Sequence, residues 1–190
     1  MQYVQQPSSL VYPHAQPPAP GQLTEIAPGV MWLRLPLPYR LDHVNIYLIE
    51  DADGWATIDT GLGTDECRAA WEAALAGPLA GQPLTRMIVT HFHPDHVGLA
   101  GWLAERFGLR LSMPRPEYLY SMALQHAPGD LGAEMHRPFY LRHGLTPEIT
   151  ELVLSRGHEY LNRTTGVPVT YHRIQHGDVM QIGKRKFEIL

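Results

Sequence analysis

The sequence predicts an α/β domain, and the stretch between residues 84 and 112 carries most of that prediction. Residues 84–90 form a nearly continuous apolar run, which is typical of a strand buried in the middle of a sheet. A helical pattern with one apolar face follows over 97–107, and a short apolar segment comes next at 109–112. A strand, a helix and a second strand in this order indicate an α/β architecture.

The residues before this unit predict further strands and one more helix. Three apolar segments separated by turns indicate a meander of strands, at 30–35, 44–49 and 55–59. A helix is predicted over 64–76, with Thr64 as its N-cap and Gly77-Pro78 as its stop. We therefore expect one mixed sheet built from the strands of 30–60 and 84–112, with both helices on its outer face.

The remaining segments define the domain organisation. Residues 1–22, rich in proline and glutamine, predict an extended arm, and residues 23–190 predict one domain. Within that domain, residues 114–166 predict a mostly helical insertion between short strands. One of its helices is expected over 117–125, before Pro128-Gly129, and another from Thr146.

Long inserted segments in compact domains often carry function, so we interpret this insertion as a lid over a functional cleft. The side chains that it could offer to a substrate are Tyr118, Tyr120, His126, His136, Phe139, Tyr140 and His143.

Composition excludes several classes of function. Hydrophobic residues make up 44% of the chain and charged residues 18%, as in soluble globular proteins. The formal net charge of −4 offers no basic surface, so nucleic acid is not an expected partner. No apolar run reaches the length of a bilayer and no signal-peptide pattern is visible, so we expect no membrane association and a cytoplasmic protein. The single cysteine, Cys67, is expected to be a small buried hydrophobic residue.

Four side chains able to bind a metal fall within six residues, directly after the buried strand. The segment is His91-Phe92-His93-Pro94-Asp95-His96. Imidazoles and a carboxylate suit zinc, and also iron or manganese. Because successive side chains of an extended segment alternate in direction, His91 and His93 can converge on one ion, while Asp95 and His96 lie past the turn. Three histidines and an aspartate packed this closely favour a metal site over a set of exposed polar residues.

This segment resembles the H-x-H-x-D-H signature of the metallo-β-lactamase superfamily. A second match lies upstream, where residues 55–61 resemble the strand of that family that ends in Asp-Thr-Gly, here Asp59-Thr60-Gly61. The resemblance implies the N-terminal part of a metallo-β-lactamase-like αββα sandwich, with the helical insertion added. It also implies that Asp59 sits beneath the metal site and orients a metal-bound histidine, as outer partners of metal ligands do.

The resemblance further implies a two-metal hydrolase. His91 and His93 would bind the first ion, and Asp95 and His96 the second. Two zinc ions about 3.5–4 Å apart, or iron or manganese in their place, can hold a hydroxide that attacks the substrate. Asp95 would be catalytic as well as a ligand, because it could orient this hydroxide and pass its proton to the leaving group.

One departure from the family pattern is evident. The later histidine, bridging aspartate and last histidine of the family are not found, and residues 175–190 resemble the hairpin that precedes them. We therefore interpret these residues as the N-terminal portion of a larger enzyme. We expect the 190-residue chain by itself to bind metal weakly, to be inactive and to self-associate through an uncovered sheet face. Tight binding would point to a further ligand, and the candidates are His126, His136, His158, His172 and His176.

The form of the motif narrows the expected substrate. Flavodiiron oxidoreductases of the family carry Glu in place of His93, true β-lactamases commonly lack His96, and tRNA-processing phosphodiesterases usually carry Gly in place of Pro94. The H-x-H-P-D-H form resembles the glyoxalase II and lactonase-like branches, so a small-molecule thioester, lactone or related ester is expected. Two alternatives remain open: an iron-dependent persulfide oxygenase, and an inactive fragment or pseudoenzyme that serves as a binding domain.

Overall fold

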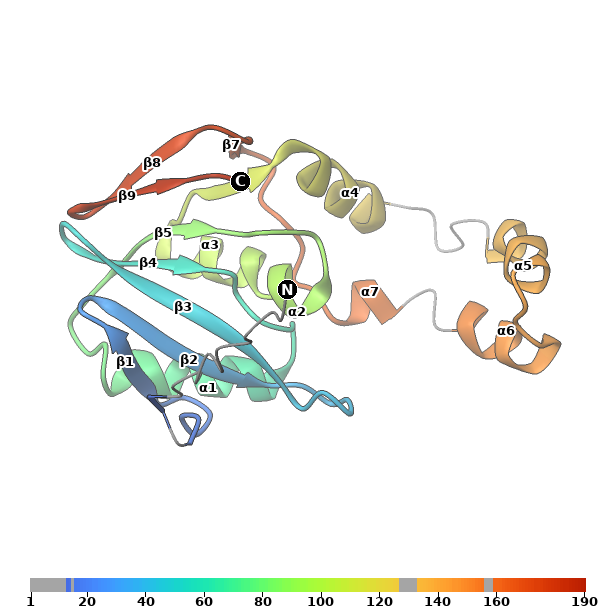
Figure 1. The fold of residues 1–190 in the computed structure, drawn as a ribbon, viewed down its shortest axis with the longest axis horizontal. Helices are drawn as coiled ribbons and strands as arrows, with labels where there is room; N and C mark the ends of the chain where they lie inside the picture. Colours follow the sequence, from blue (N-terminus) through green and yellow to red (C-terminus); the bar gives the residue numbers. More distant parts are fainter. Residues whose placement is uncertain (1–12, 15, 127–132, 156–158) are drawn as a thin grey trace, which may run out of the picture.

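The fold is α/β, as the sequence predicts, and its centre is one mixed seven-stranded sheet (Figure 1). The computed structural model describes residues 13–14, 16–126, 133–155 and 159–190. The strands follow one another across the sheet in chain order. They are β1 (Leu23–Ala27), β2 (Val30–Pro36), β3 (His43–Asp51), β4 (Gly54–Ile58), β5 (Leu84–Ile88), β6 (Leu111–Pro114) and β7 (Tyr171–Ile174). Strands β1 to β4 pair antiparallel, and β4 to β7 pair parallel. A separate hairpin is formed by β8 (Val179–Ile182) and β9 (Arg185–Glu188).

The helices of the described residues lie after β4 and after β5, and in the segment between β6 and β7. They are α1 (Asp65–Ala76), α2 (Pro94–Val97), α3 (Ala100–Phe107), α4 (Arg115–His126), α5 (Ala133–Arg142), α6 (Pro147–Leu154) and α7 (Glu159–Asn162). Thr64 and Thr146 cap α1 and α6 through their side chains, as predicted. The predicted stop at Pro128-Gly129 lies outside the described residues. None of the described helices combines the length and apolar character needed to cross a bilayer.

Two predicted boundaries were wrong and one strand was missed, and each difference has a physical reason. The helix predicted over 97–107 begins only at Ala100, as α3, and is separated from the preceding short helix α2. The break occurs because the Leu99 N–H donates to the Gly61 carbonyl and the Gly98 carbonyl accepts from Thr165. The strand predicted over 84–90 ends at Ile88, because Thr90 turns its N–H to a side chain instead of a neighbouring strand. Strand β7 was not predicted, since its polar residues at the sheet edge show no apolar alternation.

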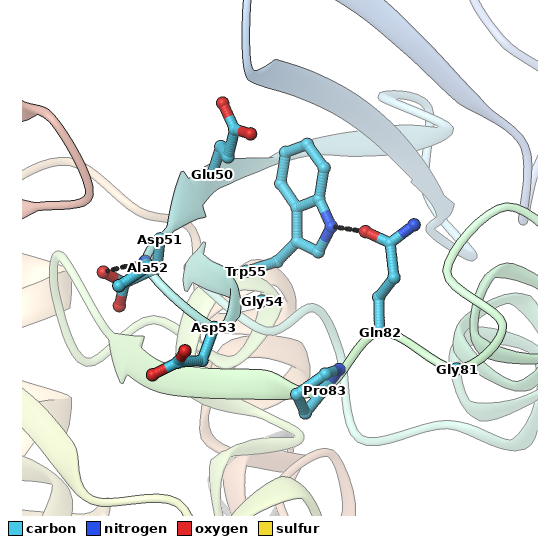
Figure 2. A pocket seen from close by; sticks show the side chains of 9 residues that line it. All are labelled: Glu50, Asp51, Ala52, Asp53, Gly54, Trp55, Gly81, Gln82 and Pro83. Carbon is cyan, nitrogen blue, oxygen red and sulfur yellow. Dashed lines mark hydrogen bonds between the residues drawn. The ribbon is translucent and has the colours of Figure 1, made fainter.

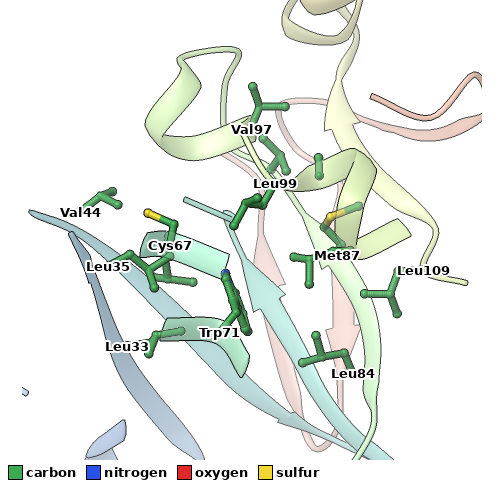
Figure 3. Packing of buried hydrophobic residues seen from close by; sticks show 14 of the residues in the cluster. Leu33, Leu35, Val44, Cys67, Trp71, Leu84, Met87, Val97, Leu99 and Leu109 are labelled. Atoms are coloured by element: carbon green, nitrogen blue, oxygen red, sulfur yellow. The ribbon is translucent and has the colours of Figure 1, made fainter. Parts of the chain in front are cut away.

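The main core lies between one face of the sheet and helices α1 and α3, which confirms their predicted common face (Figure 3). Trp71 of α1 and Leu103 of α3 are fully buried there, together with Leu33 and Met87 from the strands. Cys67 is buried as predicted, and burial raises the pKa of its thiol. The core between the sheet and these two helices holds β4 and β5 in place, and these strands lead into the Asp59-Thr60-Gly61 and 91–96 motifs.

The opposite face of the sheet is partly covered by the β8–β9 hairpin. Ile49 and Ile88 are 5% and 6% exposed and pack in a second cluster with Ile182 of the hairpin. The prediction of an uncovered sheet face, with the apolar residues of 44–49 and 84–90 facing nothing, is therefore wrong for Ile49 and Ile88, because the hairpin folds over them. Tyr47 on β3 stays 36% exposed.

The buried carboxylate of Asp51 ties this hairpin to the sheet. It accepts hydrogen bonds from the Thr85 hydroxyl (2.8 Å), the Arg86 Nε (2.8 Å) and the backbone N–H of Gly183 (2.9 Å). Burial opposes ionisation of Asp51, but these bonds and the Arg86 charge outweigh burial and lower its pKa from the ordinary value of 3.8.

Replacing Asp51 should therefore destabilise the fold. We expect Asp51→Ala to lower the free energy of unfolding by about 2–4 kcal/mol, because it leaves Arg86 and two backbone N–H groups without their acceptor. The measurement is urea unfolding followed by circular dichroism. The exposed neighbour provides the control, since Asp53→Ala should change stability by less than about 0.5 kcal/mol.

The Asp51 effect should also depend on pH. A carboxyl whose pKa is lower in the folded than in the unfolded chain stabilises the fold above the unfolded value of 3.8, and this contribution is lost as pH falls through the lower folded value. The difference between the wild-type chain and Asp51→Ala should thus be full at pH 6 and shrink below about pH 4. A difference that grows on acidification would contradict this assignment.

Candidate metal centre

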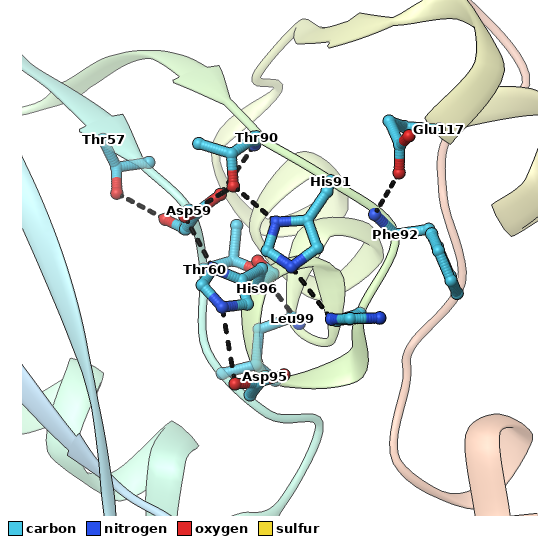
Figure 4. A network of polar contacts seen from close by, with 11 residues as sticks. Thr57, Asp59, Thr60, Thr90, His91, Phe92, Asp95, His96, Leu99 and Glu117 are labelled. Atoms are coloured by element: carbon cyan, nitrogen blue, oxygen red, sulfur yellow. Dashed lines mark hydrogen bonds and ion pairs between the residues drawn. The ribbon is translucent and has the colours of Figure 1, made fainter.

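The two sequence motifs meet at one edge of the sheet. Asp59 follows β4 and His91 follows β5, and these strands are parallel neighbours, so their carboxyl ends lie side by side. The structure brings Asp59, His91, His93, Asp95 and His96 together at this edge (Figure 4). All five predicted site residues therefore belong to one group.

Asp59 holds an unusual backbone conformation. It is the only non-glycine residue with positive φ (64°) within the described part of the chain. Its N–H donates to the Ile88 carbonyl (2.7 Å), and its own carbonyl accepts from the Thr57 hydroxyl (2.8 Å). Aspartate tolerates the left-handed region better than most residues, and strained backbone held by surrounding bonds is concentrated at functional sites.

The Asp59 carboxylate orients two of the histidines. It accepts directly from the His96 Nδ1 at 2.8 Å, and it accepts from the Thr90 backbone N–H (2.7 Å) and hydroxyl (2.9 Å). The same hydroxyl lies 2.9 Å from the His91 Nδ1. Since the hydroxyl proton points to Asp59, this oxygen accepts from His91. Both rings are thereby held with a proton on Nδ1 and with Nε2 turned to the site.

The spacing of the donor atoms fits a zinc-type ion. His91 Nε2 and His93 Nδ1 are 3.0 Å apart, and His96 Nε2 and the Asp95 Oδ2 are 3.4 Å apart. Two ligands at about 2.0–2.1 Å from a tetrahedral zinc ion are separated by about 3.3 Å. Each pair therefore supplies two neighbouring ligand positions. Within the described ranges no three His, Cys, Asp or Glu side chains form a group that could hold an ion. An ion at either pair needs further ligands.

The protonation states of the His91–His93 pair and of the Asp95–His96 pair are shifted by different causes. Burial disfavours a charged His96, but hydrogen bonds to Asp59 and Asp95 outweigh burial and raise its pKa to about 9. The hydrogen bond with His96 lowers the pKa of Asp95 and keeps this carboxyl ionised. Burial and the neighbouring His96 and His93 lower the pKa of His91, so this imidazole is neutral at pH 7. Neutral imidazole and ionised carboxylate are the forms that bind metal, and at His96 an ion must displace a proton.

Close packing of the two motif loops keeps the group in place. The Thr60 N–H and hydroxyl both donate to the His96 carbonyl, each at 2.8 Å. Gly98 is closely surrounded by the backbone of other residues. A Cβ added there would lie 2.3 Å from the Pro94 carbonyl oxygen and 2.6 Å from that of Gly61. Only glycine allows the loops to approach this closely.

Two of the predicted lid residues, Tyr118 and Tyr120 on α4, have different surroundings. Tyr118 is buried, stacks on Tyr171 and donates to the Pro168 and Val169 carbonyls, so its prediction as a substrate contact was wrong and it packs the core instead. Tyr120 does lie at the site: its ring centroid is 4.4 Å from that of Phe92, and the Phe92 ring is 4.7 Å from that of His93.

The other lid candidates lie on or near α4 and α5. His126 ends α4. The rings on α5 and directly after it contact one another, His136 with Tyr140 and Phe139 with His143. Figure 1 shows α5 and α6 standing to one side of the sheet, away from α2. Of the alternative ligands, His172 lies on β7 and His176 in the turn before β8, and His158 lies outside the described residues.

Three residues at the site were missed by sequence reasoning: Thr90, Glu117 and Tyr160. Thr90 links Asp59 to His91, and Glu117 and Tyr160 hydrogen-bond the Phe92 backbone. The position of Thr90 directly before the motif was a usable signal. The sequence gives no such signal for Glu117 and Tyr160, because only the fold brings the inserted helices next to the loop that contains Phe92.

A separate hollow of about 290 Å³ lies at the amino ends of β4 and β5 (Figure 2). Its lining includes Glu50, Asp53 and Trp55, and the Trp55 Nε1 donates to the Gln82 side chain at 2.5 Å. Asp59 and His91 lie past the carboxyl ends of the same strands, so the hollow is distinct from the donor group. Its nine lining residues include no histidine or cysteine.

The fold and this site define a known class of protein. The sequence profile of the family described as the metallo-beta-lactamase superfamily matches residues 39–182. The chain belongs to this superfamily.

Relatives of known structure agree with this assignment. A beta-lactamase domain protein from Burkholderia ambifaria is 36% identical, with a TM-score of 0.75 over 92% of this chain and 50% of its own. A metallo-beta-lactamase family protein from Thermus thermophilus is 28% identical, with a TM-score of 0.70 over 87% of this chain and 52% of its own. The probable metallo-hydrolase YqjP of Bacillus subtilis (strain 168) is 34% identical over 71 residues, which are 37% of this chain and 22% of YqjP. The chain thus spans about half the length of these two structural relatives.

Removing the charge of Asp59 should weaken metal binding. Asp59→Asn keeps a residue type that tolerates positive φ but removes the carboxylate that orients His91 and His96. We expect the zinc dissociation constant, measured by competition with a chromophoric chelator, to rise at least roughly tenfold. Asp53→Asn, at an exposed position distant from the group, should leave it unchanged. Equal zinc affinity of both variants would show that Asp59 does not support a metal site.

Proposed function

We propose that the protein is a metal-dependent hydrolase that acts on a thioester, lactone or related ester. The observation that carries the proposal is the pair of donor sets at zinc-ligand spacing, with two histidines oriented by the single carboxylate of Asp59. Membership of the metallo-beta-lactamase superfamily supports the proposal, as does the similarity to a Bacillus subtilis protein named as a probable metallo-hydrolase.

The residues present have distinct roles in this reaction. His91 and His93 would hold one divalent ion, and Asp95 and His96 a second, with zinc as the first choice and iron or manganese as substitutes. Bound ions would lower the pKa of water towards about 7 and polarise the scissile carbonyl. Asp95, ionised by its hydrogen bond with His96, would accept a hydrogen bond from the attacking water and carry its proton to the leaving group.

The surroundings of His93 support an acyl substrate. The Phe92 ring packs edge-on against His93, and Tyr120, 53% exposed, continues the aromatic surface. An uncharged aromatic wall suits the apolar part of an ester or thioester. A phosphoryl substrate would be expected to meet arginine or lysine donors instead.

The test compares substrates of different chemistry. The polypeptide made from the full reading frame that encodes these residues would be loaded with zinc, iron or manganese, and assayed on a thioester, a lactone and a phosphodiester. We expect turnover of the thioester or the lactone above that of the phosphodiester. The described part of the 190-residue chain offers two ligands for each ion, so we expect no turnover from this chain by itself. Preferred turnover of the phosphodiester, or none of the three, would overturn the proposal.

A matched pair of histidine variants assigns the activity to the site. His93→Ala should abolish turnover, because it removes one of the two donors of the first pair. His14→Ala, whose ring lies beside Trp32 of β2, should retain the kcat of the parent protein. Equal losses in both variants would place the activity elsewhere.

A further inference from the structure

The peptide backbone between the first two histidines is held from two directions by the helical insertion. The Phe92 N–H donates to the Glu117 Oε2 at 3.1 Å, and the Phe92 carbonyl accepts from the Tyr160 hydroxyl at 3.1 Å (Figure 4 shows the first of these bonds). Glu117 lies on α4 and Tyr160 on α7. The first and last helices of the insertion thus hold the same residue.

The residues that make these contacts are themselves fixed. Next to Glu117, Tyr118 is 6% exposed and donates to the Val169 carbonyl at 2.7 Å, which ties α4 to the segment before β7. The Ser121 hydroxyl donates to the Glu117 carbonyl at 3.0 Å. Burial raises the pKa of Tyr160, so its phenol stays protonated and remains a donor.

The backbone of Phe92 itself lies outside regular secondary structure. Strand β5 ends at Ile88 and α2 begins at Pro94, so Phe92 lies in neither a sheet ladder nor a helix. A backbone group without such a partner must find a side chain or water. The torsion angles of Phe92 determine where the His91 and His93 rings stand relative to each other. A change in these angles would alter the 3.0 Å separation of His91 Nε2 and His93 Nδ1.

We propose that Glu117 and Tyr160 are positioning residues, which set the spacing of the His91–His93 donor pair by holding the Phe92 peptide. The inference rests on the proposed function in taking this pair as metal ligands. Neither residue needs to touch the ion or the substrate. The inserted helices α4 and α7 would then be part of the metal site, rather than extra packing for the sheet.

The test uses variants that remove one bond at a time. Tyr160→Phe removes only the hydroxyl, and Glu117→Ala removes the acceptor, whereas Glu117→Gln restores an acceptor oxygen. Tyr140→Phe on α5 and Glu105→Ala at an exposed position of α3 are the matched controls. Cobalt(II) serves as the probe ion, because its visible absorption reports the geometry of its ligands, and melting temperatures monitor the fold.

We expect Tyr160→Phe and Glu117→Ala each to raise the cobalt dissociation constant roughly tenfold and to shift the visible spectrum. Glu117→Gln should recover most of the affinity, and both controls should match the parent chain. Unchanged affinity and spectrum in Tyr160→Phe and Glu117→Ala would overturn the positioning role. So would losses that occur only in variants whose melting temperature collapses.

A metal-free measurement separates this inference from the proposed function. In the metal-free chain, the imidazole ¹⁵N chemical shifts of His91 and His93 should change in Tyr160→Phe, while those of His172 should not. If these shifts change but the parent chain binds no cobalt, the positioning contact stands and the proposed metal function fails. If cobalt binds and neither these shifts nor the affinity respond, the metal function stands and the positioning role is wrong.

Discussion

The carboxylate of Asp59 is the group on which the arrangement of the site depends. Asp59 is 5% exposed, and its carboxylate accepts hydrogen bonds from the His96 ring, the Thr90 hydroxyl and the Thr90 backbone N–H. Through that hydroxyl it also orients His91. One buried charge therefore determines which nitrogen of two imidazoles faces the site. Such a charge is stable only with several donors around it, and the segment that follows β5 supplies them through Thr90 and His96.

The sheet places this carboxylate, and the loops maintain its position. Because β4 and β5 are parallel neighbours, Asp59 and the 91–96 segment emerge at the same edge although they are distant in sequence. The positive φ of Asp59 turns its side chain towards that edge. The conformational cost is offset by the bonds that Thr60 makes to the His96 carbonyl and by the close contact of the loops at Gly98.

The site has two structural supports of different origin. The sheet and α1 hold the side that contains Asp59, where the Trp71 Nε1 donates to the Thr60 carbonyl at 2.8 Å. The insertion holds the other side, through Glu117 and Tyr160 on the Phe92 backbone. The aromatic surface formed by Phe92 and Tyr120 belongs to this second support. A displacement of the inserted helices can therefore move the nitrogen atoms of His91 and His93 through the Phe92 peptide, without altering the sheet.

The sequence by itself determined the α/β class, the order of β2 to β6, the two main helices and which histidine and aspartate side chains gather at the carboxyl ends of β4 and β5. These features depend on local patterns: apolar runs, the Thr64 and Thr146 caps, and histidine and aspartate side chains packed into 91–96. The tertiary structure decided what depends on contacts between distant segments. It ended β5 early because Thr90 bonds to Asp59, and it divided α2 from α3 because Leu99 bonds to Gly61. It also assigned Tyr118 to the core and Glu117 and Tyr160 to the site, since side chains on one inserted segment carry no local mark of which distant loop they will meet.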